Sequence, residues 1–486
     1  MGQAILIERN IPTPKPGWPI LTAMTVVILS LFLGWVIVSL KGLPLVIVMV
    51  LAPFMLLFAM AKPRHALYLL VALALIVDEK LTAGMQLHRG VGELTDRVLY
   101  WIPLTPLELL LMAALLGYLA RAACMKTVPV RLGTFFWLMV PLFLFILFGL
   151  ITGLMRGGDR RMALWELRAI FYMPGVYLLF YNTIKTKQHL QIIAWIILLS
   201  IGFVALLGSW TYFVILGTDL GERQSITDHQ QGIFFNVLFL LPAAHAIYRS
   251  RGWQRWVALA AVPLGFVTWV ATDRRSAYVA LVVGFVALLA LAYRDDKSRV
   301  VKLGLALAVI SGLYAGVFWN SSGFWAKPLQ GVRSVEAQPG DPEYASNQYR
   351  ELEKWNIALT IRNNALFGVG FGNEFEMYIP MAYWDSPFRN FITHNSVLWV
   401  WMKTGVAGFI AYLMFLCLAI SGAARVYRKL PDWQLKPPLA VGLAFIIMYT
   451  IYSYVDQGWD YKGMVYSGVV LGSFAVIERM LLSRTE

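Results

Sequence analysis

Long apolar blocks dominate this sequence, each about 17 to 22 residues long and separated by shorter polar segments. A helix of that length crosses the hydrocarbon core of a bilayer with all of its backbone hydrogen bonds satisfied internally. The composition agrees, because 59% of the residues are hydrophobic and only 14% are charged, whereas a soluble domain carries about 25% charged residues. A soluble enzyme, a disulfide-stapled secreted domain and a disordered protein are excluded. We predict an all-α polytopic integral membrane protein.

The apolar blocks predict fourteen membrane spans, with twelve or thirteen as alternatives because short spans and boundaries are read least securely from a sequence. The third block is short for a bilayer. The predicted spans are 20–39, 43–60, 66–77, 104–120, 132–153, 169–184, 190–217, 232–248, 256–272, 276–293, 303–319, 396–421, 437–455 and 462–480.

The basic residues of the loops orient these spans, since cytoplasmic loops are enriched in Lys and Arg. With the N-terminus placed in the cytoplasm, 22 of the 41 basic residues but only 6 of the 27 acidic residues fall on the inner side. This asymmetry accounts for the whole net charge of +14, so the charge does not require a nucleic-acid partner. The even number of spans predicts that both termini are cytoplasmic.

Three regions follow from this reading: an N-terminal transmembrane bundle over 1–319, a long outer loop over 320–395, and C-terminal transmembrane helices over 396–486. The loop is too aromatic for a solvated linker, and a long ordered loop is usually functional. Residues 347–366 place Leu352, Trp355, Leu359 and Arg362 at helical spacing. We therefore predict an amphipathic helix on or near the membrane surface.

Arginines gather on the predicted outer side. Arg274 and Arg275 occupy a tight turn between two spans, where charges are costly unless they are paired or used. Pairing with Asp273 and snorkelling is the structural alternative. Arg350 and Arg362 add cations from the outer loop, and several guanidiniums on one face would suit a phosphate-bearing ligand. A second outer group comprises Arg156, Arg160, Arg161 and Arg168.

His394 stands at the end of the long loop, directly before the twelfth span. A single histidine at a helix entrance is more often structural than catalytic. Its position nevertheless suits a base that takes a proton from a hydroxyl near neutral pH. Asn395 or Ser396 is expected to cap the helix that follows.

Other patterns favour less specific interpretations. The glycines of 368–372 follow no predicted strand and predict a tight turn rather than a nucleotide loop. Asp295 and Asp296 lie among basic residues and resemble a solvated charge cluster more than a metal site. The histidines form no zinc-binding pair, and Cys124 and Cys417 fall in or beside different spans. We expect no metal and no cofactor.

The most specific motif is His394-Asn395, nine further residues, and then Gly405-Val-Ala-Gly408. This resembles the His-[Asn/Ser/Gln]-x9-Gly-x-x-Gly signature of the O-antigen ligase family of bacterial envelope glycosyltransferases. Two other segments are also similar to parts of that family. One runs from Arg350 to Ile361 and continues through the turn that ends at Gly372, and the other is Arg275 with the Ser-Ala-Tyr that follows it. The stretch from Leu104 is also similar to part of the family's N-terminal half. The resemblance is specific over about 270–410, and family members typically have about twelve spans.

The resemblance implies a glycosyltransferase C-like fold and a donor glycan carried on undecaprenyl diphosphate. The glycan would pass to an acceptor hydroxyl on the periplasmic face of the bacterial inner membrane, with inversion and without a metal. Arg275 and Arg350 would hold the diphosphate, with Arg274 as the alternative to Arg275, and His394 would act as base or orient the acceptor. Further contacts to the substrate are expected from Arg274, Arg362, Asn395 and Tyr349.

The motif cannot separate the activities found in that family. A ligase attaches the glycan to lipid A core and a polymerase attaches it to a growing polysaccharide. Both are favoured here over a protein O-oligosaccharyltransferase. A flippase for lipid-linked oligosaccharides is the alternative from another class. It would favour an internal repeat and charges in the middle of spans. No repeat is visible, and the ionisable groups are interpreted as lying at span ends, apart from Glu108.

Overall fold

The computed structural model describes residues 18–39, 44–78, 80–81, 104–125, 129–221, 225–250, 252–341, 343–382, 388–431 and 434–483, and these residues contain helices but no strands. The α-helices are α1 (Trp18–Ser39), α2 (Pro44–Ala61), α3 (Pro63–Ile76), α6 (Pro106–Cys124), α7 (Gly133–Met155), α8 (Arg160–Arg168), α9 (Tyr172–Thr183), α10 (Lys187–Trp210), α11 (Gln231–Ile247), α12 (Trp253–Thr272), α13 (Arg275–Ala292), α14 (Lys297–Phe318), α15 (Lys327–Arg333), α16 (Tyr344–Asn363), α17 (Ser396–Lys429), α18 (Lys436–Val455) and α19 (Tyr461–Leu482). A π-helical turn η1 (Thr211–Ile215) extends α10, and two 3₁₀ turns, η2 (Phe324–Ala326) and η3 (Ser334–Glu336), flank α15.

Each of the fourteen predicted spans coincides with a helix. Nine of the described helices are long and apolar enough to cross a membrane, which confirms a polytopic helical membrane protein. The predicted spans 66–77, 169–184 and 232–248 correspond to α3, α9 and α11, which have only 14, 12 and 17 residues. At about 1.5 Å per residue, α9 is only about 18 Å long, shorter than the hydrocarbon core.

Several helices begin at side chains that cap their free backbone N–H groups. Thr105 and Glu108 form a reciprocal capping box at the start of α6, with Pro106 in the first turn. Asp159, Asp296 and Asp460 accept hydrogen bonds from the first turns of α8, α14 and α19. Local sequence therefore fixes where these helices start.

The contacts between loops follow the predicted alternation of the two sides. At the predicted inner ends, Lys436 contacts Asp295 at 2.7 Å and Arg64 contacts His189 at 2.7 Å. At the predicted outer ends, Lys327 pairs with Asp273 at 2.7 Å. Each of these contacts joins loops predicted to share a side, so the structure places them as the alternating spans require.

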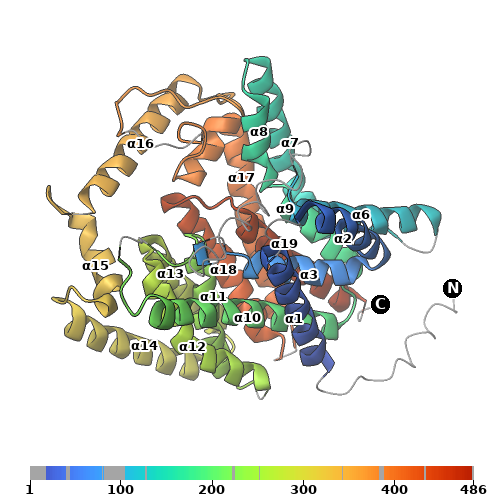
Figure 1. Ribbon diagram of the computed structural model, residues 1–486, viewed down its shortest axis with the longest axis horizontal. Coiled ribbons are helices and arrows are strands. Elements are labelled where there is room, and N and C mark those ends of the chain that lie inside the picture. Colours follow the sequence, from blue (N-terminus) through green and yellow to red (C-terminus); the bar gives the residue numbers. More distant parts are fainter. Residues whose placement is uncertain are drawn as a thin grey trace.

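Residues 320–395 contain α15 and α16, so much of this segment is ordered helix. Figure 1 shows α15 and α16 as an arch that runs from the region of α13 and α14 towards the N-terminal end of α17. The predicted amphipathic face is only partly correct. Leu352 and Leu359 are half-buried, whereas Trp355 and Arg362 are exposed. The buried side instead includes Asn356 and Thr360, because their polar groups bond the backbone of residues 376–379.

The glycines of 368–372 form a backbone crossing between α7 and α17. Gly368, Gly370 and Gly372 all have positive φ, and a Cβ on Gly370 would lie 2.3 Å from Cα of Gly153 in α7. Gly405, also at positive φ, kinks α17, and a Cβ there would lie 2.1 Å from the carbonyl oxygen of Leu366. Only glycine permits this conformation and this approach. The tight-turn interpretation therefore fits, and the crossing fixes the end of the outer segment against α17.

Candidate active site

The candidate site is organised by one face of α16. Asn347, Arg350 and Glu353 follow at three-residue intervals, so they lie on adjacent turns of the same side. Asn347 Oδ1 accepts a hydrogen bond from Arg275 at 2.7 Å, and Glu353 contacts His394. This helix therefore links the tight turn before α13 to the entrance of α17.

His394 is held by a buried carboxylate. Its Nδ1 lies 3.1 Å from Oε2 and 3.2 Å from Oε1 of Glu353, and its backbone N–H donates to the same carboxylate at 3.0 Å. The side chain of Glu353 is 2% exposed and that of His394 is 32% exposed. A carboxylate only accepts, so Nδ1 carries the proton and the Nε2 lone pair of the neutral imidazole is available as a base. The ring of Tyr349 meets the imidazole edge-on at 5.9 Å.

The chain around His394 is fixed by the start of α17. Asn395 Oδ1 accepts from the backbone N–H of Leu398 at 2.9 Å, which confirms Asn395 as the cap. Its buried Nδ2 has no hydrogen-bond partner within the described part of the chain. Ser396 Oγ accepts from the N–H of Gly458 at 2.9 Å, which ties this entrance to the loop before α19.

The two adjacent arginines have different surroundings. Arg275 bonds Asn347 and Ser334 and pairs with Glu343 at 3.1 Å, so it fastens the outer segment to α13. Arg274 contacts Nε2 of His229, and its buried Nε has no hydrogen-bond partner among the residues that the structure describes.

Arg350 approaches both members of the doublet. Burial lowers the pKa of Arg274, the nearby carboxylate of Asp456 opposes that change, and the positive charges of Arg350 and Arg275 lower the pKa further. Within the described ranges, Arg350 itself makes no hydrogen bond or ion pair with the protein. The carboxylates of Glu343 and Asp456 offset part of this positive charge, and a guanidinium fork suits an anionic ligand. These guanidiniums can therefore bind an anion.

The other predicted arginines do not join this cluster. Arg362 is exposed and lies 12 residues beyond Arg350 on α16, about 18 Å along the helix axis. Arg156 donates to the carbonyl oxygen of Gly368 at 2.6 Å. Arg168 instead forms a two-point ion pair with Glu108, at 2.9 and 2.8 Å. Of the predicted arginines in the described ranges, the structure therefore brings together Arg274, Arg275 and Arg350.

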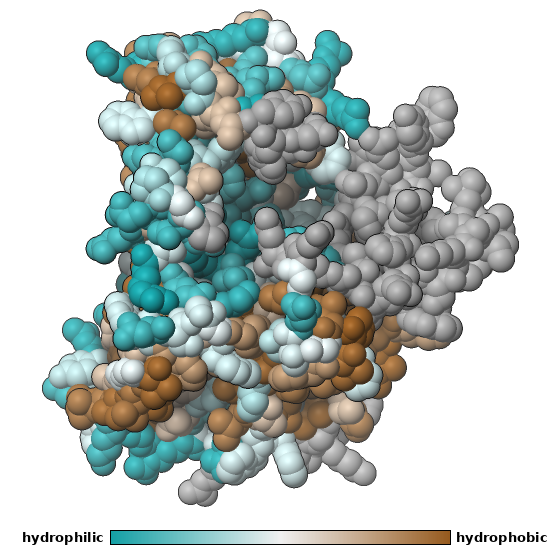
Figure 2. Space-filling view, turned by 60° about the vertical axis from the view of Figure 1, so that its left-hand side comes forward, coloured by the Kyte–Doolittle hydropathy of each residue, from teal (hydrophilic) through white to brown (hydrophobic). Residues whose placement is uncertain are grey.

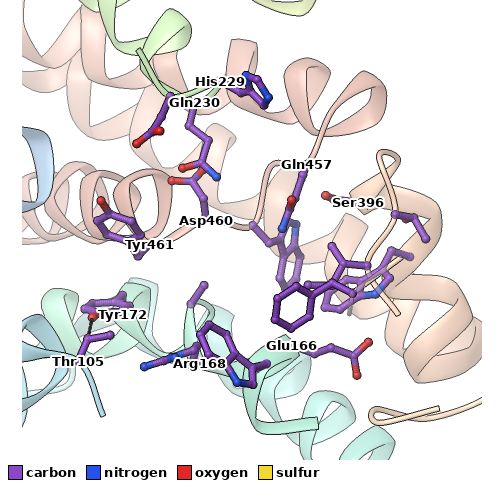
Figure 3. A pocket seen from close by; sticks show the side chains of 18 of the residues that line it. Thr105, Glu166, Arg168, Tyr172, His229, Gln230, Ser396, Gln457, Asp460 and Tyr461 are labelled. Carbon is purple, nitrogen blue, oxygen red and sulfur yellow. Dashed lines mark hydrogen bonds between the residues drawn. The ribbon is translucent and has the colours of Figure 1, made fainter. Parts of the chain in front are cut away.

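A cavity of about 390 Å³ lies beside these groups. Thr393 and Ser396, which flank His394, form part of its wall, and so does His229, the partner of Arg274. Figure 3 shows Ser396 and Glu166 on one side of the space and Tyr172 and Tyr461 on the other. Every lining residue lies at a predicted outer end, and Figure 2 shows a hydrophilic hollow above a hydrophobic band. The cavity thus reaches the sequence neighbours of His394 and the histidine that contacts Arg274.

Sequence reasoning missed the buried charges. Lys403 lies inside α17 and pairs with Glu166 at 2.6 Å, both side chains being fully buried. This corrects the interpretation that only Glu108 departs from the span ends. Lys462 lies between Asp78 and Asp228, at 3.8 and 3.7 Å. A lysine within an apolar span is itself a signal, because the bilayer penalises it unless it is paired.

Comparison with known proteins supports the sequence resemblance. Residues 259–413 match the model of the O-antigen ligase family, a segment that includes Arg274, Arg275, Arg350, Glu353 and His394. The chain matches no curated protein. The cavity walls from α6, α8, α9 and α19 lie outside the matched segment. The similarity to the O-antigen ligase family thus covers residues 259–413.

Proposed function

We propose that this protein transfers a glycan from undecaprenyl diphosphate to an acceptor hydroxyl. The family domain supports an activity of the O-antigen ligase or polymerase kind. The observation that carries the more specific proposal is the pairing of His394 with buried Glu353. Glu353 lies one helical turn from Arg350, and Asn347, one turn further along α16, binds Arg275. Arg350 and the carboxylate that holds the proposed base then share one face of α16.

In the proposed reaction, Nε2 of His394 takes the proton of the acceptor hydroxyl while Glu353 stabilises the resulting imidazolium. The acceptor oxygen bonds to C1 of the donor sugar, and the bond from C1 to the diphosphate oxygen breaks on the opposite face, which inverts C1. Arg274 and Arg350 stabilise the charge that accumulates on the leaving diphosphate, while Arg275 holds α16 beside them through Asn347. The proton later leaves His394 for the diphosphate or for water.

The proposed setting is the bacterial inner membrane, with both termini cytoplasmic and the site facing the periplasm. The excess of basic residues on the predicted inner side supports this orientation. All lining residues of the cavity lie at the opposite ends of the helices.

The two acceptors to separate are lipid A core, which a ligase uses, and a growing polysaccharide, which a polymerase uses. We expect His394→Ala to abolish transfer while the folded protein accumulates normally, with His65→Ala as the control at the other end of the bundle. The glycan left on undecaprenyl diphosphate in these cells is then measured. Long stranded chains would identify a ligase, and single repeats would identify a polymerase.

The same experiment tests the less favoured functions. A glycoprotein acceptor would indicate a protein O-oligosaccharyltransferase, and loss of glycan from the outer leaflet would indicate a flippase. Wild-type product with His394→Ala would contradict the proposed base.

The proposed reaction uses no metal ion, because the arginines supply the positive charge at the diphosphate. We expect the purified protein to retain full transfer activity in EDTA. Loss of activity that returns on adding a divalent cation would contradict this part of the proposal.

A further inference from the structure

Aromatic side chains form a substantial part of the wall of the cavity beside His394. Six aromatic side chains contribute to its lining: Trp165, Tyr172, Phe388, Trp399, Trp459 and Tyr461. Aromatic faces offer broad, rigid apolar surfaces, and the C–H bonds on one face of a pyranose ring pack well against them. Such a wall suits a sugar ring more than a flexible lipid chain or an anion.

The wall is also held in place. The guanidinium of Arg168 stacks over Trp165 at 4.3 Å, and Phe388 packs against the same indole with ring centroids 5.3 Å apart. Arg168 is itself fixed by its two-point pair with Glu108. A surface ordered before binding loses little conformational entropy when the ligand arrives.

The polar groups of the lining favour an uncharged ligand. Amides and hydroxyls come from Gln230, Gln457, Thr393 and Ser396, and they can bond ring hydroxyls that stand at the edge of the sugar. Among the described lining residues, the cations are Lys80 and Arg168, and three of the four carboxylates are paired with Arg168, Lys403 and Lys462. Arg168 is already paired with Glu108. A diphosphate would therefore prefer the arginine cluster to this cavity.

The position of the cavity identifies which sugar it would hold. One edge is formed by the neighbours of His394 and another by His229, the partner of Arg274. A sugar in this space would have a hydroxyl near the base. It would face C1 of the donor sugar, whose diphosphate the arginines hold. We propose that the cavity is the acceptor subsite and binds a neutral pyranose unit of the acceptor glycan by aromatic stacking. This inference rests on the proposed glycosyl transfer.

Direct binding tests the subsite separately from transfer. His394→Ala protein in detergent is titrated by calorimetry with two probes: the repeat-unit oligosaccharide released by mild acid from the lipid carrier, and the core oligosaccharide released from lipopolysaccharide. We expect at least one probe to bind. Binding of the core identifies a ligase acceptor, and binding of the repeat unit alone identifies a polymerase acceptor.

Two lining variants and one matched control locate the binding. Trp165→Ala and Gln457→Ala, each made in the His394→Ala protein, are expected to weaken binding about 10-fold or more, and Trp165→Phe should restore most of the loss. Trp355→Ala, an indole that is 55% exposed on α16, should bind as the parent does. If neither probe binds, or if all variants bind equally, the acceptor subsite is wrong.

Transfer kinetics separate this inference from the proposed function. In otherwise wild-type protein, Gln457→Ala should raise KM for the acceptor and leave KM for the lipid-linked donor unchanged. A change in donor KM alone would overturn the acceptor assignment. Full transfer by His394→Ala would instead contradict the proposed base while leaving the binding results valid.

Discussion

At the scale of single residues, the site depends on a distinction that sequence alone cannot make. Glu351 and Glu353 lie two positions apart on α16 in the same polar stretch, yet Glu351 is 58% exposed and Glu353 is 2% exposed. Packing of α16 against the entrance of α17 determines which carboxylate meets His394. The motif predicted the histidine, but its partner became evident only from the fold.

This pair supplies its own control experiment. Glu353→Gln should lower kcat on the order of 10²- to 10⁴-fold, because the neutral amide cannot stabilise the imidazolium that forms at His394. Glu351→Gln should leave kcat near wild type, since that carboxylate pairs only with exposed Lys354 in the described structure. Initial rates across pH check both variants. If kcat were retained and only the melting temperature fell, Glu353 would have a structural role alone.

The arginine doublet gives a second prediction at this scale. Arg274→Lys should raise KM for the lipid diphosphate donor and lower kcat, because a lysine cannot reproduce a planar guanidinium donor in a partly buried site. Arg275→Lys should act mainly on stability, because Arg275 already bonds Glu343, Ser334 and Asn347. Donor kinetics and thermal melting in detergent separate the two effects. The opposite result, with Arg275 controlling donor KM, would restore the original assignment of Arg275.

At the scale of the helices, hydropathy predicted positions well and internal features poorly. All fourteen spans fall on helices, and Asn395 caps α17 as expected. The kink at Gly405 was not predicted, because a single glycine in an apolar span has no distinct signal until its neighbours are known. Lys403 was missed for a related reason. Its charge is tolerated through contact with Glu166 of α8, a partner more than 200 residues away in the sequence.

The kink can be tested with two glycines of the same helix. Gly405→Ala should destabilise the protein by at least about 2 kcal/mol, because φ is +72° and the new Cβ would clash with the carbonyl of Leu366. Gly422→Ala should be neutral or slightly stabilising, since its Cβ would lie 3.5 Å from the Phe135 ring and Ala favours a helix. Thermal unfolding in one detergent measures both. Equal melting temperatures would show that α17 does not need the kink.

At the scale of the whole molecule, the alternation of loops and the asymmetry of charge lead to the same two-sided arrangement. The loop contacts depend on packing, whereas the charge bias depends on insertion into the membrane. These are independent constraints on the orientation of one chain. Sequence could therefore predict which loops share an end. It could not show that those loops enclose a cavity beside His394, because the walls come from helices scattered over the whole length of the chain.

The orientation itself can be measured by labelling cysteines in intact cells. Cys124 and Cys417 are both exposed and are first replaced by serine. Val335→Cys, at a position that is 78% exposed in the outer segment, should then react with a membrane-impermeant maleimide added outside, once the reagent has entered the periplasm. Ser298→Cys, exposed at the start of α14, should react only after lysis, because positive-inside insertion places it in the cytoplasm. The reverse pattern would place His394 and the arginines in the cytoplasm and rule out a periplasmic acceptor.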